Sequence, residues 1–133
     1  MSLRSYIKNT ADPLYSRYIR VKEADRYGYC TCVTCGKRDF WRDVDAGHYV
    51  NRDDWPTRYE DRNVHAQCRA CNRFHGGRIS RYAVYLTERY GDDVLFELDQ
   101  QSRKVKTFTL TDLKDWCKIW KAEIDKMSIV KNL

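Results

Sequence analysis

The stretch that decides the fold runs from Asn63 to His75 and has the sequence NVHAQCRACNRFH. Its Cys-x-x-Cys pair follows an earlier pair, Cys32-Val-Thr-Cys35, at a distance of roughly thirty residues. Two such pairs are typical of four thiolate ligands on one tetrahedral zinc ion. Because one ion would hold both segments together, we predict a structural Zn²⁺ site formed by Cys32, Cys35, Cys68 and Cys71.

The chain has six cysteines, and disulfides are the alternative to metal binding. The opening residues Met-Ser-Leu-Arg-Ser-Tyr-Ile-Lys contain no hydrophobic core of a secretory signal, which argues against an oxidising compartment. Metal binding is therefore favoured. Cys30 lies two residues before the first pair, and we expect it to be a small buried apolar residue rather than a ligand.

Length and composition favour one domain over residues 1–133. The chain carries 25 Lys and Arg against 19 Asp and Glu, a net charge of +6 that favours an anionic partner such as nucleic acid. Its many Tyr and Trp residues argue against disorder. No apolar stretch approaches the length of a membrane span, so we expect a soluble intracellular protein with no membrane partner.

Helix signals flank the cysteine-rich region, which covers about residues 29–77. Asp12-Pro13, an N-cap followed by a first-turn proline, predicts a helix over about residues 12–27, whereas residues 1–11 carry no clear pattern. Apolar periodicity predicts further helices over about residues 79–127, the first of which is expected to stop near Gly91. We expect the last helix to start with a capping box at Thr109, and its apolar stripe to pack in the core or, alternatively, to form a dimer contact.

Strand signals inside the cysteine-rich region predict an α+β fold. We expect Phe40–Trp41 and the segment 44–50 to form the two arms of a hairpin, with Asp45 and His48 on the second arm. Residues 68–75 are expected to form a short helix, and a basic connector, Arg103–Lys106, is expected before the last helix.

The residues between the cysteine pairs suit phosphodiester hydrolysis. This reaction needs a base that deprotonates water and a hard cation that stabilises the phosphate and the leaving oxygen. A neutral His48 suits the first need, and the side-chain oxygen of Asn72, placed beside the zinc site, suits Mg²⁺ or Mn²⁺. We therefore predict two different metal sites, one closed by thiolates and one open to substrate.

The pattern Asp45-x-x-His48, Asn63 and Cys68-x-x-Cys71-Asn72 resembles the HNH, or His-Me finger, nucleases with a treble-clef (ββα-metal) zinc core. A longer run is similar to the NinG (Rap) recombination proteins of lambdoid phages: Tyr18-Ile19-Arg20, Cys32-x-x-Cys35-Gly36, Gly47-His48-Tyr49, Arg52, Thr57-Arg58, Asn63 and Gln67-Cys68-x-x-Cys71-Asn72. This resemblance implies a metal-dependent endonuclease that cuts branched DNA, such as Holliday junctions or D-loops, in the cytoplasm of a bacterial host.

Roles carry over from the resemblance position by position. His48 matches the general base, Asn72 the metal-binding Asn, and Asn63 the Asn that holds the hairpin and the base in place. Many HNH nucleases have an acidic metal ligand directly before the histidine, where this chain has a glycine. The candidates to complete the catalytic metal site are therefore Asp45 and His75, and the expected DNA contacts are Arg52, Arg58, Arg73 and Arg78.

Several alternatives stay open at this point. The chain could be a non-catalytic zinc module that binds nucleic acid or protein, or an HNH nuclease with a different substrate. Arg58 could be an ordinary loop charge rather than a phosphate clamp, and His65 a surface residue or a support for the site. Longer NinG proteins have a further N-terminal cysteine-containing region, so the chain is expected to be a fragment or a short member. A homodimer is a further possibility.

Overall fold

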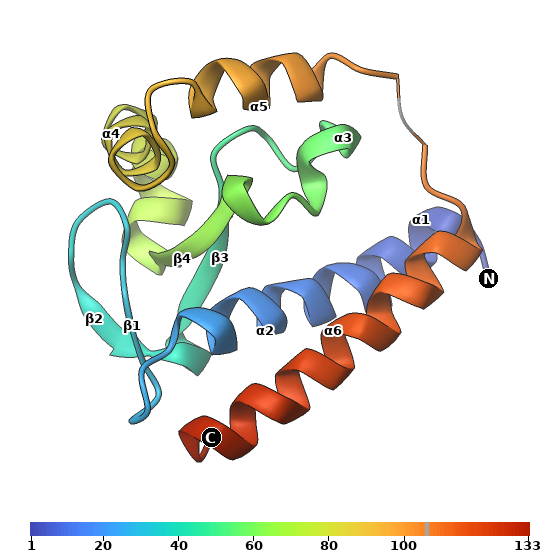
Figure 1. Cartoon of the computed structure of the whole chain (residues 1–133), viewed down its shortest axis with the longest axis horizontal. Helices are drawn as coiled ribbons and strands as arrows, with labels where there is room; N and C mark the ends of the chain where they lie inside the picture. Colours follow the sequence, from blue (N-terminus) through green and yellow to red (C-terminus); the bar gives the residue numbers. More distant parts are fainter. Residues whose placement is uncertain (106) are drawn as a thin grey trace.

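The computed structural model describes residues 1–105 and 107–133 and combines helices with two small antiparallel sheets, an α+β fold (Figure 1). One residue of the predicted basic connector, Lys106, lies outside the described residues. The elements, with 3-10 and π turns marked η, are α1 (Leu3–Tyr6), η1 (Ile7–Ala11), α2 (Asp12–Glu23), β1 (Tyr29–Thr31), β2 (Arg38–Phe40), η2 (Trp41–Asp43), β3 (Val44–His48), α3 (Trp55–Arg58), η3 (Asp61–Asn63), β4 (Val64–Cys68), η4 (Ala70–Phe74), η5 (Gly76–Arg78), α4 (Ile79–Tyr90), α5 (Val94–Ser102) and α6 (Leu110–Lys131).

The first helix begins much earlier than predicted. Ser2 is its N-cap and accepts a hydrogen bond from the backbone N–H of Ser5, whereas Asp12 lies inside the helix. The π turn η1 precedes Pro13, and there the N–H of Asp12 bonds to the carbonyl of Ile7. Because proline lacks an N–H and crowds the carbonyl four residues before it, this wider turn lets the helix continue through Pro13. The helix ends at Glu23, before the predicted stop near residue 27.

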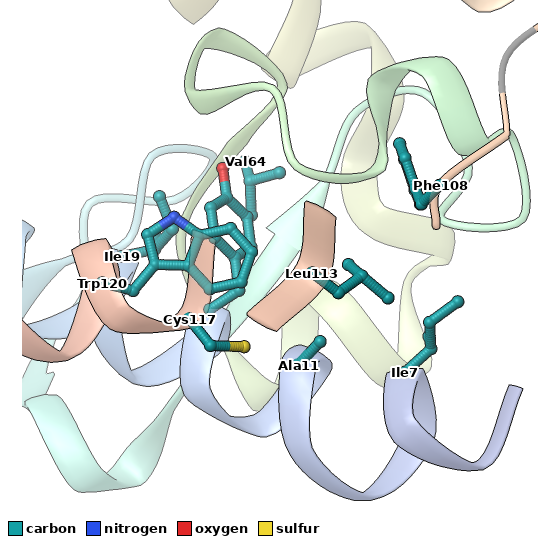
Figure 2. Packing of buried hydrophobic residues seen from close by; sticks show 9 residues of the cluster. Ile7, Ala11, Ile19, Val64, Phe108, Leu113, Cys117 and Trp120 are labelled. Atoms are coloured by element: carbon teal, nitrogen blue, oxygen red, sulfur yellow. The ribbon is translucent and has the colours of Figure 1, made fainter. Parts of the chain in front are cut away.

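The longest helix, α6, packs along α2 (Figure 1). The predicted capping box is present: Thr109 Oγ1 accepts from the N–H of Asp112, and the Asp112 carboxylate accepts from the N–H of Thr109, both at 3.0 Å. The apolar stripe of α6 includes the buried residues Leu113, Cys117, Trp120 and Ile124. Figure 2 shows part of this stripe packed against α2, so the predicted core packing of these residues is confirmed.

The two sheets pair differently from the predicted hairpin. β1 pairs with β2, and β3 pairs with β4, a strand more than a dozen residues later, with His48 opposite Val64. The 3-10 turn η2, with Trp41 buried, separates Phe40 from β3 and redirects the chain. All five residues of β4 are buried, so this strand gives β3 a partner inside the protein. The predicted pairing of Phe40–Trp41 with β3 is therefore wrong.

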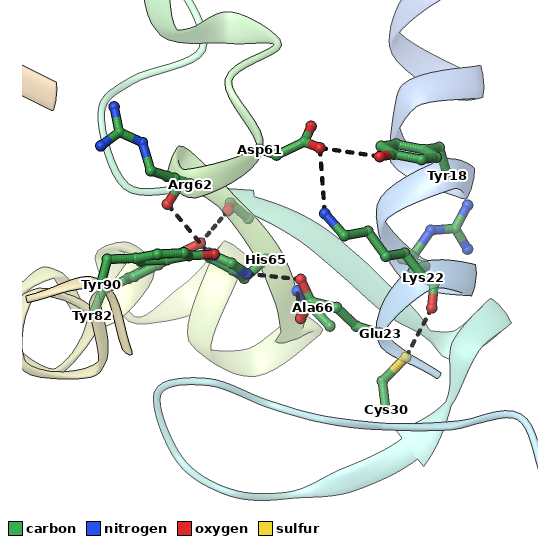
Figure 3. A network of polar contacts seen from close by, with 12 residues as sticks. Tyr18, Lys22, Glu23, Cys30, Asp61, Arg62, His65, Ala66, Tyr82 and Tyr90 are labelled. Atoms are coloured by element: carbon green, nitrogen blue, oxygen red, sulfur yellow. Dashed lines mark hydrogen bonds and ion pairs between the residues drawn. The ribbon is translucent and has the colours of Figure 1, made fainter. Parts of the chain in front are cut away.

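Polar side chains connect α2 to β4 and to the turn η3 that precedes it (Figure 3). Glu23 accepts from His65 Nδ1 at 2.7 Å and from the N–H of Ala66 at 3.0 Å. Asp61 accepts from Tyr18 Oη at 3.0 Å, and Lys22 also contacts it at 3.3 Å. His65 is only 3% exposed, so the prediction of a surface residue is wrong and the support role remains.

The helices that follow the cysteine-rich region form their own apolar cluster. Tyr82 and Leu86 of α4 pack against Val94 and Leu98 of α5. The predicted end of α4 near Gly91 is confirmed, because this residue has φ +99°, which favours glycine. Over residues 1–105 and 107–133, no helix combines the length and the apolar character that spanning a membrane requires.

Candidate active site and thiol cluster

Four thiols converge where the two sheets meet η4. Cys32 and Cys35 lie in the turn between β1 and β2, Cys68 ends β4, and Cys71 lies in η4. Their sulfur atoms all lie within 4.8 Å of one another, and Cys35 Sγ is 3.7 Å from Cys68 Sγ. Tetrahedral zinc with bonds of about 2.3 Å places its sulfurs about 3.8 Å apart. The cluster could therefore hold one metal ion, as predicted, and is consistent with structural zinc.

The residues around the thiol cluster have distinct contacts. Cys30 is fully buried outside the cluster and donates its thiol to the carbonyl of Arg20, so its predicted burial is confirmed. Gly36, with φ +80°, turns the chain after Cys35. Arg78 donates from Nε to Cys71 Sγ at 3.2 Å, which directs this predicted DNA contact toward the thiol cluster instead.

A hollow of about 260 Å³ lies between the start of α2, β3 and η4. Three of the predicted catalytic and metal-binding residues line it, namely Asp45, His48 and Asn72. Asp45 and His48 lie three residues apart on β3. Asn72 directly follows Cys71, so the same turn that supplies a thiol also supplies an amide to the hollow. Arg52 and Arg73 line the hollow as well, beside the carboxylates of Asp12 and Asp45.

The imidazole of His48 is held in one orientation. Its Nε2 lies 2.9 Å from the backbone carbonyl of Arg58. A carbonyl only accepts, so Nε2 carries the proton and Nδ1 keeps its lone pair. Within the described residues, Nδ1 has no hydrogen-bond partner. Burial lowers the pKa of His48 from its usual value, and this effect outweighs the hydrogen bond to Arg58, so the ring is neutral at pH 7. His48 therefore has the form that a general base requires.

Asp45 and Asn72 form a hydrogen-bonded pair in the hollow. Asn72 Nδ2 donates to Asp45 Oδ2 at 3.0 Å, and Arg73 binds both carboxylate oxygens at 2.9 and 2.8 Å. Burial raises the pKa of Asp45, but the bonds from Arg73 and Asn72 outweigh it and leave this pKa below its usual value. Since the carboxylate holds Nδ2, the side-chain oxygen of Asn72 remains available as a hard ligand.

The buried residue Asn63 joins the segment after β3 to α3, the helix that carries Arg58. Its Oδ1 accepts from the N–H of Val50 at 2.7 Å, and its Nδ2 donates to the carbonyls of Val50 and Thr57 at 3.0 and 3.2 Å. The carbonyl that orients His48 belongs to the residue after Thr57. The contacts of Asn63 agree with the positioning role that was predicted for it.

Comparison with known proteins assigns the chain to a family. The family model for the Bacteriophage Lambda NinG protein matches residues 1–129. The chain belongs to the NinG family. The ninG protein of Salmonella phage P22 is 32% identical over 123 residues, which are 90% of this chain and 55% of that protein. The ninG protein of Escherichia phage lambda is 31% identical over 123 residues, which are 90% of this chain and 54% of that protein.

The relatives are longer than this NinG-family chain. The ninG protein of Escherichia phage 933W is 31% identical over 104 residues, which are 76% of the chain but 48% of that protein. The chain thus spans about half the length of the curated relatives it matches. No solved structure matches it.

The glycine before the histidine in this NinG-family chain has a packing reason. A Cβ on Gly47 would lie 2.0 Å from Gln67 Oε1, in a buried place that the Gln67 side chain fills. Gln67 Nε2 donates to Thr34 Oγ1 and to the carbonyl of Gly77, which fixes the amide beside the thiol cluster. An acidic side chain therefore has no space at this position, and only Asp45 brings a carboxylate from β3 to the hollow.

Two other predicted site residues have different surroundings from those expected. His75 is exposed and does not line the hollow, because η4 ends at Phe74 and His75 has the non-helical backbone angles φ −122° and ψ 30°. Arg58 is 8% exposed, and its guanidinium binds the carboxylate of Asp12 and the carbonyl of Arg52. This binding leaves Arg58 little freedom to contact a phosphate.

One wall of the hollow is formed by α2, an arrangement that was not predicted from the sequence. Asp12, Tyr15 and Ser16 lie there beside residues of β3 and η4. Asp12 was interpreted only as a helix cap, and no local signal distinguishes a cap from a residue that pairs with a distant arginine. The spacing of Asp12, Tyr15 and Ser16 does place them on one helix face, but only the packing of α2 on β3 shows what that face covers.

Proposed function

We propose that this NinG-family protein is a metal-dependent DNA endonuclease that cuts branched recombination intermediates. The observation that carries the proposal is that His48, whose Nε2 is bound to Arg58 and whose Nδ1 is unpaired among the described residues, lines one hollow with Asn72, the residue after Cys71 of the thiol cluster. A base and an oxygen ligand supported by one scaffold suit hydrolysis of a phosphodiester. The order of cysteine turn, β3, β4 and η4 supports assignment to the treble-clef HNH nucleases, with zinc at the thiols.

In this mechanism His48 removes a proton from the attacking water at Nδ1. The carbonyl of Arg58 holds the opposite nitrogen, so the ring keeps its direction and its proton on Nε2 while Nδ1 accepts. Asn63 keeps α3, which provides this carbonyl, next to the end of β3. Arg52, which is exposed at the edge of the hollow, is suited to hold a phosphate oxygen of the substrate.

The residues of the hollow fit a hard divalent cation. Asn72 Oδ1 and the carboxylate of Asp45 are oxygen ligands of the kind that Mg²⁺ and Mn²⁺ prefer. When bound, such an ion supplies charge stabilisation at the phosphate and at the leaving oxygen. Asp45 would share its carboxylate between the ion and Arg73, which is exposed and able to turn toward the DNA backbone.

One observation favours a second candidate, a non-catalytic zinc module that binds nucleic acid. Asp45 is already paired with Arg73 through both oxygens, as it would be if it served only to hold η4 against β3. The net charge of +6 fits this function as well as it fits a nuclease. The two candidates differ in whether DNA is cut.

Cleavage of a four-way junction and of a linear duplex of matched sequence, each with Mg²⁺, with Mn²⁺ and without added metal, tests the proposal. We expect metal-dependent cutting that favours the junction. Equal cutting of both DNAs would indicate an HNH nuclease of a different substrate class. Binding without cutting under any condition would favour the zinc module.

A further inference from the structure

A second, larger hollow of about 740 Å³ adjoins the candidate active site. It lies between the first helices and the segment around α3, and it shares Asp12, Ser16 and Arg52 with the His48 hollow. Arg4 and Lys8 line its far part. From Arg4 to Ser16 the helix covers about 18 Å at the usual rise per residue. A ligand in this groove would therefore extend directly into the proposed active site.

The charges of the groove suit an anionic ligand. Arg4, Lys8 and Arg52 are exposed, and Arg4 and Lys8 have no acidic partner within residues 1–105 and 107–133. Asp12 also lines the groove, but Arg58 and Tyr59 bind its carboxylate and compensate its charge. Asp53 is the remaining acidic group, against three cations. Cations without internal partners are suited to external phosphates.

The groove also has an apolar and aromatic lining. Ile7, Pro13 and Trp55 contribute to it. The Trp55 ring stacks on Phe108 with centroids 5.3 Å apart and planes within 4°, so its plane is fixed before any ligand arrives. A row of cations beside a fixed aromatic ring is the combination that single-stranded nucleic acids require, with phosphates on the cations and a base on the ring. The volume corresponds to a drug-sized ligand, which is about one or two nucleotides rather than a duplex.

We infer that this groove binds a single-stranded arm of the DNA substrate and leads it to the His48 hollow. Phosphates contact Arg4, Lys8 and Arg52, and a base lies against Trp55. The inference rests on the proposed nuclease function for the direction of the strand, and it specifies the substrate as DNA that is unpaired next to the cleaved phosphate.

Binding by a protein that cannot cut tests the groove separately from catalysis. The His48→Ala variant and a His48→Ala/Arg4→Ala/Lys8→Ala variant are titrated, without added divalent metal, into a fluorescein-labelled oligothymidylate and into a blunt duplex. Fluorescence anisotropy gives the affinities between about 50 and 200 mM salt. The matched control is His48→Ala/Lys118→Ala/Lys121→Ala, which removes two exposed cations of α6 that do not line the groove. Circular dichroism establishes that all variants are folded.

We expect the groove variant to lose single-strand affinity on the order of tenfold at low salt and to show a salt slope shallower by about 1.4, since each phosphate contact on a single strand contributes about 0.7. Duplex binding changes by less, and the control changes neither. Single-strand binding equal to that of the control would overturn the inference, as would an equal loss on both DNAs. Failure of wild-type protein to cut any DNA would contradict the proposed function. The binding result would still test the groove, because it does not depend on cleavage.

Discussion

The protonation state of the His48 imidazole depends on its burial and on the backbone carbonyl of Arg58. Burial disfavours the imidazolium and lowers the pKa of His48, while the carbonyl of Arg58 fixes the proton on Nε2. The base is active when neutral, so we expect kcat/KM for DNA cleavage to fall as the pH drops through this pKa, with a midpoint below the usual value of about 6.5. A pH series on wild-type protein measures this midpoint. An acidic limb centred above 6.5 would contradict the assigned environment.

Gly47 is constrained by its neighbour rather than by backbone conformation. A Gly47→Ala substitution introduces a Cβ that meets the buried Gln67 side chain, and we expect it to lower the free energy of unfolding by about 1–3 kcal/mol. Thermal unfolding of the single variant and of the same change made in a Gln67→Ala background measures the effect. The penalty should shrink in the second background, where space is available. An unchanged melting temperature in the single variant would show that the contact is not tight.

At the residue scale, the sequence predicts chemistry better than it predicts partners. The four thiols, His48 and Asn72 could be found because each belongs to a short motif. The bidentate bond from Arg73 to Asp45 joins residues 28 positions apart and has no local signal. His75 was expected beside Asn72 because the prediction continued a short helix through residue 75, whereas the helical turn ends at Phe74.

At the scale of elements, the thiol cluster joins the β1–β2 turn to the end of β4. We expect Cys68→Ala to lose the proposed zinc and with it several kcal/mol of stability, which is a large part of the total for a small domain. Cys30→Ala is the matched control, because Cys30 is buried but lies outside the cluster. Metal content by mass spectrometry and thermal melting compare the two variants. Equal metal content in both would remove Cys68 from the site.

A buried ion pair joins α2 to α3. Arg58 binds Asp12, and both side chains are largely buried, at 9% and 15% exposed. Arg58→Ala leaves the Asp12 carboxylate without its main partner, so we expect a loss of about 3–5 kcal/mol. Arg52→Ala removes an exposed arginine from the segment before α3 and should change stability by less than about 0.5 kcal/mol. Denaturant unfolding compares them, and similar midpoints would refute the structural role of Arg58.

Some helix boundaries could be predicted from neighbouring residues, whereas the strand pairing could not. The α6 capping box and the end of α4 at Gly91 follow from neighbouring residues, and both were predicted. The start of the first helix was missed because Asp12-Pro13 resembles a helix start, whereas η1 accommodates the proline inside a longer helix. The pairing of β3 with β4 depends on contacts between distant segments, which alternation within one strand does not reveal.

At the scale of the whole molecule, α2 connects the separate parts. The C-terminal end of α2 binds β4 through Glu23. Its N-terminal end forms a wall of the His48 hollow and of the larger groove that Arg4 and Lys8 line. The packing of α6 along α2 holds this helix in place. The positive charge that the composition predicts is thereby brought next to the proposed site of cleavage, an arrangement that composition alone could not locate.

The most direct measurement is junction cleavage by wild type, His48→Ala and His75→Ala in Mg²⁺ or Mn²⁺, with zinc content and melting temperature recorded for each. Both variants remove one imidazole, but only His48 lines the hollow. We predict that His48→Ala lowers the rate at least about 100-fold, the scale of general base catalysis, while it retains zinc and fold, and that His75→Ala cuts like wild type. Cleavage retained by folded His48→Ala would contradict the account.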